Sequence, residues 1–311
     1  MLARASHWFD RTILELGREF RLSYLPPLMV YVAYGVSGLT AIVGTFFVKD
    51  YLGLSAEFLA ALGFWAGIPW ALKMPLGHLV DLIWRHKAGL VYLGACLTAA
   101  SLLIMVGLLG NPDAMGAMMP VEAWFVLSTL LAPVGFVVQD VVADAMTVEA
   151  VPLLDQEGNP FPAGTKRLMH TTMQTLGRVA IIGGTVFVAL LNVFMFAGVE
   201  NLDEQAKLEI YIRIYEIALI IPVVSVAGVL LSGILKRREL RRLLSHGIDA
   251  VKAGDMVHGQ VERTSPNWWI LGGSLLFVIF TITMGLTEVP YNQEIIFAGS
   301  MLIVLLSLIH I

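Results

Sequence analysis

The sequence contains few charged residues and almost no cysteine. Charged residues make up 14% of the 311 residues, whereas a soluble domain has about 25%. The single cysteine, Cys96, lies within an apolar run, so the chain has no disulfide framework of its own. The sequence also lacks a G-x-x-x-x-G-K-[ST] loop, and this absence argues against an ATP-driven pump.

The residue patterns that common enzymes require are also missing. The histidines lie mostly in loops or at the ends of apolar runs, and no His/Cys/Glu group has the spacing of a metal site. No Ser/His/Asp set is arranged for nucleophilic catalysis. We therefore predict that the protein is not an enzyme and that it holds no metal and no cofactor.

Long apolar runs dominate the sequence. Hydrophobic residues make up 57% of the chain, and the mean hydropathy is +0.78. A membrane-spanning helix needs about 20 mostly apolar residues, and this length predicts an all-α polytopic membrane protein with eight spans. The predicted spans are residues 22–48, 58–76, 88–112, 123–139, 179–199, 217–235, 264–287 and 295–311.

The basic residues predict how these spans are oriented. Most of the twenty lysines and arginines fall in the N-terminal tail and in the loops after the second span, before the fifth and after the sixth. These segments lie on one side of the membrane, so the positive-inside rule predicts a plasma (inner) membrane protein with a cytoplasmic N-terminus. Residues 1–21 place apolar side chains at helical spacing between arginines, which predicts either an amphipathic helix on the inner leaflet or a solvated extension of the first span.

The stretch PVGFVVQDVVADAMTVEA, residues 133–150, continues the fourth span but carries Gln139, Asp140, Asp144 and Glu149. Asp140 and Asp144 are four residues apart and therefore share one face of a helix. A carboxylate inside the membrane costs roughly 2.5–3.5 kcal/mol, so its presence indicates a functional site with a buried cationic partner.

Two cations in other spans are candidate partners of these aspartates. Lys73 in the second span and Asp140 in the fourth are predicted to lie at nearly the same depth. Arg178 leads into the fifth span, nearer the membrane midplane. We expect Lys73, Asp140, Asp144 and Arg178 to bind substrate or a coupling ion. Alternatively, they form a structural charge network between helices, and Asp144 joins a cluster at the cytoplasmic surface.

A second group of charges follows the second span. Gly77, Asp81, Arg85 and Lys87 have the spacing G-x-x-x-D-x-x-x-R-x-K, which resembles the loop motif between spans two and three of the major facilitator superfamily. The pattern predicts a gating latch at the cytoplasmic surface, where an acidic side chain faces basic ones. Alternatively, Arg85 and Lys87 serve only to orient the protein in the membrane.

The sequence divides into four predicted segments. The segments are residues 1–21, a six-span bundle of residues 22–235, a cytoplasmic linker of residues 236–265 with many basic side chains, and the start of a second bundle at residues 266–311. The chain ends within an apolar run, so we expect it to be truncated at its C-terminus.

Three blocks of sequence resemble the folate–biopterin transporter family, a branch of the major facilitator superfamily. The blocks are GLTAIVGTFFVKDYLGLS with the following PWALKMPLGHLVD, then QDVVADAMTVE, then QTLGRVAIIGG. The resemblance implies twelve spans in two six-helix bundles. We therefore expect a major-facilitator-type bundle with a complete N-terminal half and the first two helices of the second half.

The resemblance also implies a function. It implies uptake of folates or reduced pterins coupled to ions or protons, and charged residues in its spans two, four and five match Lys73, Asp140, Asp144 and Arg178. We expect a symporter of folate- or pterin-like anions that works by alternating access, with a proton or cation as co-substrate, the lipid bilayer as its surroundings and no nucleic-acid partner. The alternatives are a major facilitator transporter of another small organic solute and a scaffold that transports nothing.

Overall fold

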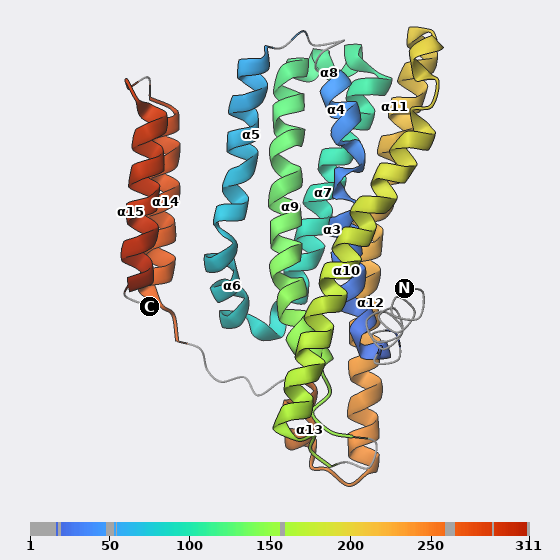
Figure 1. Ribbon diagram of the computed structural model, residues 1–311, viewed down its shortest axis with the longest axis vertical. Coiled ribbons are helices and arrows are strands. Elements are labelled where there is room, and N and C mark those ends of the chain that lie inside the picture. The colour runs from blue at the N-terminus through green and yellow to red at the C-terminus, as the bar shows by residue number, and fades with distance from the viewer. Residues whose placement is uncertain are drawn as a thin grey trace, which may run out of the picture.

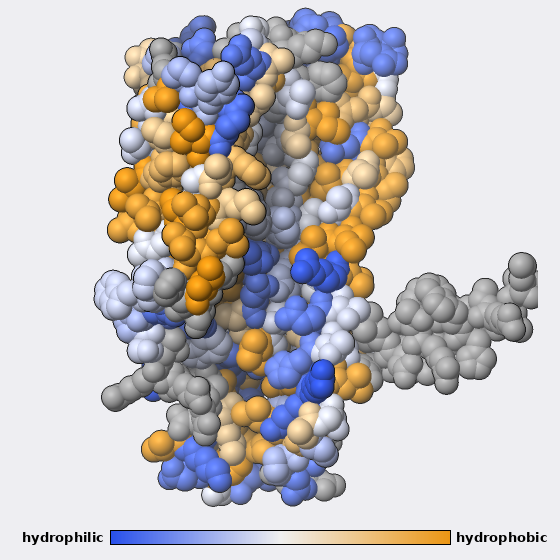
Figure 2. Space-filling model, turned by 60° about the vertical axis from the view of Figure 1, so that its left-hand side comes forward, coloured by the Kyte–Doolittle hydropathy of each residue, from blue (hydrophilic) through white to orange (hydrophobic). Residues whose placement is uncertain are grey.

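The computed structural model describes residues 20–47, 55–155, 159–258, 265–287 and 289–309, together with Gly17 and Gly53. The amphipathic helix predicted for residues 1–21 lies almost entirely outside these residues. The described part is a bundle of long helices (Figure 1). On the face that Figure 2 shows, hydrophobic residues cover much of the upper half, and hydrophilic residues lie along the top edge and gather in the lower half.

The prediction of a polytopic helical membrane protein is confirmed. Seven helical stretches of the described residues are long and apolar enough to cross a membrane. They are Leu22–Thr45, Ala56–Leu82, Ala88–Gly110, Val121–Ala150, Ala163–Asn201, Glu204–Ser245 and Trp268–Gly285. The eighth predicted span forms α15 (Asn292–Ile309), a helix with a shorter apolar stretch.

Two of these stretches consist of two helices each, and the first helix ends four residues before a proline. The second consists of α5 (Ala56–Ala71) and α6 (Lys73–Leu82), and Pro75 has no N–H to donate to the carbonyl of Ala71. The sixth consists of α11 (Glu204–Ala218) and α12 (Ile220–Ser245), and Pro222 has the same relation to Ala218. The missing N–H of each proline accounts for the end of the helix before it.

The first stretch is also interrupted, and its middle packs closely on another helix. It consists of α3 (Leu25–Gly35), the 3-10 turn η3 (Ser37–Thr40) and α4 (Ala41–Phe47). A Cβ atom added at Gly184 of α10 (Ala163–Met195) would lie 2.8 Å from the Cα of Gly35. The absence of a side chain at both positions therefore lets α3 and α10 touch through their backbones.

Helix α9 (Val121–Ala150) lies at the centre of the bundle, and it packs against α7 (Ala88–Gly110), α3, α5 and α6. A Cβ atom added at Gly94 of α7 would lie 2.6 Å from the carbonyl oxygen of Gly135 in α9. The short helix α8 (Pro112–Met118) connects α7 to α9. We call the end of the bundle at Ala150, at the bottom of Figure 1, the basic end, and the other the opposite end.

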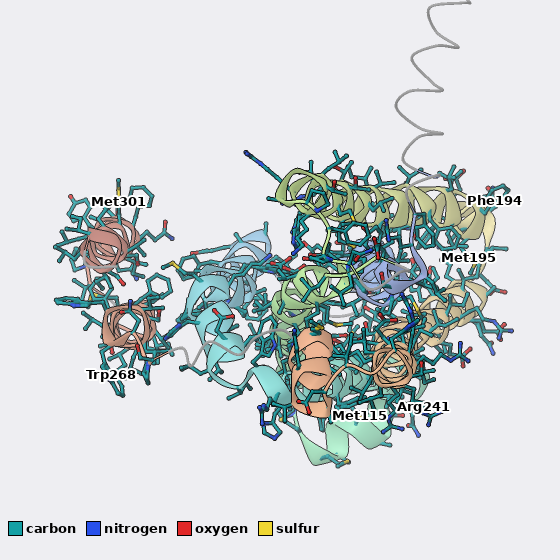
Figure 3. All side chains as sticks on the ribbon, turned by 90° about the horizontal axis from the view of Figure 1, so that it is seen from below. Met115, Phe194, Met195, Arg241, Trp268 and Met301 are labelled. Atoms are coloured by element: carbon teal, nitrogen blue, oxygen red, sulfur yellow. The ribbon has the colours of Figure 1, made fainter. Side chains whose placement is uncertain are left out.

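The predicted linker is largely helical where it is described. Helix α12 continues through Ser245, and α13 (Ala250–His258) folds back against it through Leu243, Ala253 and Val257. Helices α14 (Trp268–Gly285) and α15 pack on each other and stand apart from the rest, as the positions of Trp268 and Met301 show in the view from below (Figure 3). They meet the bundle chiefly at α6.

Candidate functional site

Lys73 forms ion pairs with both aspartates of the fourth span. Its Nζ lies 2.5 Å from Oδ2 of Asp140 and 3.0 Å from Oδ2 of Asp144. Lys73 is the first residue of α6, directly after the interruption at Leu72. Asp140 and Asp144 lie one turn apart on α9, so a single ammonium group reaches both carboxylates.

A tyrosine from a third helix completes this group. The hydroxyl of Tyr31 on α3 donates a hydrogen bond to Oδ1 of Asp144 at 2.5 Å. We call Tyr31, Lys73, Asp140 and Asp144 the central charge cluster. The side chain of Asp140 is only 5% exposed, whereas those of Lys73 and Asp144 are 42% and 46% exposed. The cluster is therefore anchored on one side and open on the other.

Arg178 lies beside the central charge cluster without joining it. The preceding residue, Gly177 of α10, packs on the ring of Tyr31, where an added Cβ atom would lie 2.8 Å from Cε2. Arg178 is exposed and close enough to interact electrostatically with Asp140 and Tyr31. Among the described residues it forms no ion pair within 4 Å, so its guanidinium group is available to a ligand.

The motif at the end of the second span is spread over two short elements. Gly77 and Asp81 lie on α6, whereas Arg85 lies in the 3-10 turn η5 (Trp84–His86) and Lys87 follows it. In the described part of the chain neither Asp81 nor Arg85 forms an ion pair within 4 Å. Lys87 instead contacts Glu149, as described next.

Glu149 holds two lysines at the basic end of the bundle. Its Oε1 lies 2.6 Å from Nζ of Lys87 and its Oε2 lies 2.6 Å from Nζ of Lys236 on α12. The side chains of Lys87 and Glu149 are 7% and 4% exposed. We call these three residues the Glu149 cluster. The sequence alone gives Glu149 no role, because several lysines lie near the same surface and nothing in the sequence selects two of them.

The environment of Lys87 disfavours its charged form. Burial lowers the pKa of Lys87 to about 8, and the attraction of Glu149 only partly opposes this effect. Nearby Lys236 lowers the pKa further. The ammonium group also lies 3.6 Å from the ring centroid of Trp84, at the distance of a cation–π contact.

A layer of three aromatic rings lies next to the central charge cluster on its opposite-end side. The ring centroids of Tyr34 and Trp70 are 5.2 Å apart, and those of Tyr34 and Phe136 are 6.4 Å apart. We call these three residues the aromatic layer. They border a cavity of about 480 Å³ that extends toward the opposite end. The aromatic layer did not emerge from the sequence, where Tyr34 is one of many aromatic residues in apolar runs.

The long apolar helices define the class of protein, a polytopic membrane protein. The ion pairs of Lys73 with Asp140 and Asp144 form a polar site among these helices. The chain is similar to a curated folate-biopterin transporter from Synechocystis sp., with 28% identity over 144 residues. The aligned region covers 45% of this chain and 27% of that transporter. No known family profile matches the chain, and no solved structure matches it.

Proposed function

We propose that this protein is a secondary transporter that carries folate- or pterin-like organic anions across the inner membrane by alternating access. The central charge cluster carries this proposal, because it joins α3, α6 and α9 within apolar helices and remains half exposed. Ionisable residues among membrane helices mark substrate and ion pathways in most proteins that have them. The similarity to a folate-biopterin transporter supports the same class of cargo.

The charged groups suit the anionic part of such a substrate. Arg178 can bind a carboxylate of a glutamate tail through two parallel hydrogen bonds, and Lys73 can bind one as a point charge. The carboxylates of Asp140 and Asp144 can accept hydrogen bonds from N–H groups of the substrate that lie beside its anionic tail. These pairings use the exposed side of the central charge cluster, where Asp144 is 46% exposed.

The stoichiometry of the central charge cluster suggests how a cation is coupled to the anion. Two carboxylates share one lysine, so Lys73 is fully engaged when both aspartates are ionised. A proton that binds a carboxylate oxygen of Asp144, or a cation that pairs with it, reduces the hold of the aspartates on Lys73. Lys73 then has one ionised carboxylate partner fewer and can pair with the carboxylate of the substrate, which makes anion and cation bind together.

The residues at the basic end are proposed to control opening toward the cytoplasm. Gly77 lies within α6, and Asp81, Arg85 and Lys87 follow it as the rest of the proposed gating motif. In this state Lys87 is held by Glu149, which ties the start of α7 to the end of α9. Opening at this end requires that this contact, or that of Lys236 with Glu149, is exchanged for another.

Uptake of labelled folate tests the proposed function. Cells that carry the complete gene should accumulate more folate than cells with an empty vector, and unlabelled reduced pterin should compete. An Arg178→Gln variant should need a substrate concentration about tenfold higher for half-maximal uptake. Uptake equal to the empty vector, with the protein present in the membrane, removes the assignment of the cargo.

The runner-up is a major facilitator transporter of another small organic solute. A ligand bound only by the folded state raises the melting temperature according to its concentration and affinity. A thermal-shift panel of folates, pterins, amino acids and other organic anions on the purified protein therefore separates the two. Stabilisation by a solute outside the folate and pterin group, and by no member of it, favours the runner-up.

A further inference from the structure

The cavity beyond the aromatic layer has a wall chemistry different from that of the central charge cluster. It has a volume of about 480 Å³, within the range of small-molecule sites, and lies among α4, α5, α7 and α9. None of its described lining residues carries a charge, and many are serine, threonine or aromatic residues. An anionic group would find no cation here, so the cavity suits a neutral ring with polar edges.

The aromatic layer lies between this cavity and the central charge cluster, and each of its rings is three or four residues along the chain from a member of the cluster. Tyr34 and Phe136 lie on helices that also contribute to the cluster, and Trp70 lies near the end of α5, just before α6, which carries Lys73. Each ring is about one turn closer to the opposite end. Tyr34 is three residues after Tyr31, and Trp70 is three residues before Lys73. Phe136 is four residues before Asp140. A ligand that touched the rings from the cavity would therefore have the charged groups one helical turn away.

Several polar groups on the cavity wall have no partner within the part of the protein that the structure describes. These are the hydroxyls of Tyr34, Ser37 and Thr129 and the indole N–H of Trp70. Others are already paired, such as Ser101 and Ser128, which bond to each other. The four residues are only partly buried, so these groups are accessible from the cavity and available to a ligand.

We propose that this cavity is a ring-binding subsite for a planar, uncharged heteroaromatic group that carries both hydrogen-bond donors and acceptors. The ring stacks on Tyr34 and Trp70, and the unpaired hydroxyl and indole groups bond to its edge. The anionic part of the same molecule reaches past the aromatic layer to Lys73. The subsite rests on the proposed function, which supplies a ligand with a flat bicyclic ring and an anionic tail.

Two half-ligands test the subsite directly. 6-Hydroxymethylpterin has the ring without the tail, and N-acetylglutamate has the tail without the ring. Their affinities for the purified full-length protein can be measured by calorimetric titration. Trp70→Leu should weaken binding of the pterin about tenfold, as expected for the loss of one stacking partner, and should leave N-acetylglutamate unaffected. Lys73→Gln should weaken N-acetylglutamate and leave the pterin unaffected.

A matched control and a second variant protect this test from effects on folding. Trp65→Leu removes the same side chain from the same helix, but Trp65 faces Gly285 of α14 and does not line the cavity. It should leave both affinities unchanged. Ala132→Leu adds volume to the cavity wall and should weaken the pterin as Trp70→Leu does.

The outcomes separate this proposal from the proposed function. Unchanged pterin binding in both Trp70→Leu and Ala132→Leu, in protein that elutes as the wild type does, overturns the subsite and leaves transport of folates intact. A wild-type protein that takes up folate but binds no free pterin also overturns it. Wild-type protein that neither binds a half-ligand nor takes up folate overturns both.

Discussion

Two charge clusters on the same helix, α9, differ in how completely they are closed. Glu149 uses both carboxylate oxygens on lysines, and its side chain is 4% exposed. Asp144 also meets a lysine, but its side chain is 46% exposed, and Arg178 nearby has no ion-pair partner in the described structure. The same residue types thus form a sealed contact at the basic end and an open one near the middle of the bundle.

This difference in closure separates a structural role from a binding role. Removing one partner of a buried ion pair costs about 3–5 kcal/mol, because the other charge is left buried and unpaired. An exposed pair contributes only about 0–1 kcal/mol and is easily exchanged for another partner. The Glu149 cluster therefore fastens helices in this state, whereas Lys73 and Asp144 can give up each other for a ligand.

The largest expected effect is the loss of transport in Asp140→Asn. Asparagine keeps the size of the side chain but removes the charge that holds Lys73 on the buried side of the cluster. Folate uptake should fall by at least about 100-fold, the range expected when a buried charge partner is removed, while the amount of protein in the membrane stays normal. Asp113→Asn, at an exposed position on α8, should leave uptake unchanged. Uptake near wild type in Asp140→Asn would remove this residue from the mechanism.

Glu149→Gln should instead act on stability. Its two lysines would lose their counter-charge, so the free energy of unfolding should fall by about 3–5 kcal/mol. The melting temperature of the purified protein measures this loss. Glu239→Gln, at a half-exposed pair with Arg242, is the matched control and should change it by less than about 1 kcal/mol. Equal melting temperatures for the two variants would show that the Glu149 cluster does not stabilise the packing of the helices.

The stability of the Glu149 cluster should also depend on pH. The pKa of Lys87 is lowered from its ordinary value of 10.5 to about 8, so between these values the unfolded chain binds more protons than the folded one. The free energy of unfolding of the wild type should therefore rise with pH from about 8 to 10, by roughly 1–3 kcal/mol relative to Lys87→Met. Parallel melting curves for the two proteins across this window would contradict the lowered pKa.

The smallest expected effect is that of Tyr31→Phe. The change removes the hydroxyl that donates to Asp144 and leaves the ring that packs on Gly177. Because Asp144 is half exposed and water can replace the lost donor, uptake should fall by about tenfold or less. Tyr92→Phe on the exposed face of α7 is the matched control. A complete loss of uptake in Tyr31→Phe would mean that the hydroxyl has a larger part than orienting Asp144.

The sequence predicted two features, the long apolar helices and the ion pairs of the lysine that lies among them. The apolar runs indicated the seven long helices because each is long enough to cross a bilayer. Lys73 emerged as the partner of Asp140 and Asp144 because a lysine inside an apolar run needs a carboxylate. The geometry of that contact agrees with this reasoning, since both distances are 3.0 Å or less.

Other features could not be predicted because they depend on how the helices are rotated against one another. Glu149 selects Lys87 and Lys236 from several nearby cations, and only the positions of α7 and α12 decide between them. The hydroxyl of Tyr31 reaches Asp144 because α3 packs closely on α10 and α9. The interruption at Leu72 is of a different kind, because it follows from the missing N–H of Pro75 and not from helix rotation, although none of the predictions from the sequence uses that residue.

Uptake by the double variant Lys73→Gln/Asp140→Asn tests most directly whether the central charge cluster is a binding site. The double variant keeps side chains of similar size and removes both charges of the Lys73–Asp140 pair together, so a purely structural pair would tolerate it. We predict that it transports as little as either single variant while reaching the membrane in normal amounts. Restoration of wild-type uptake would contradict the account, because it would show that the pair only joins helices.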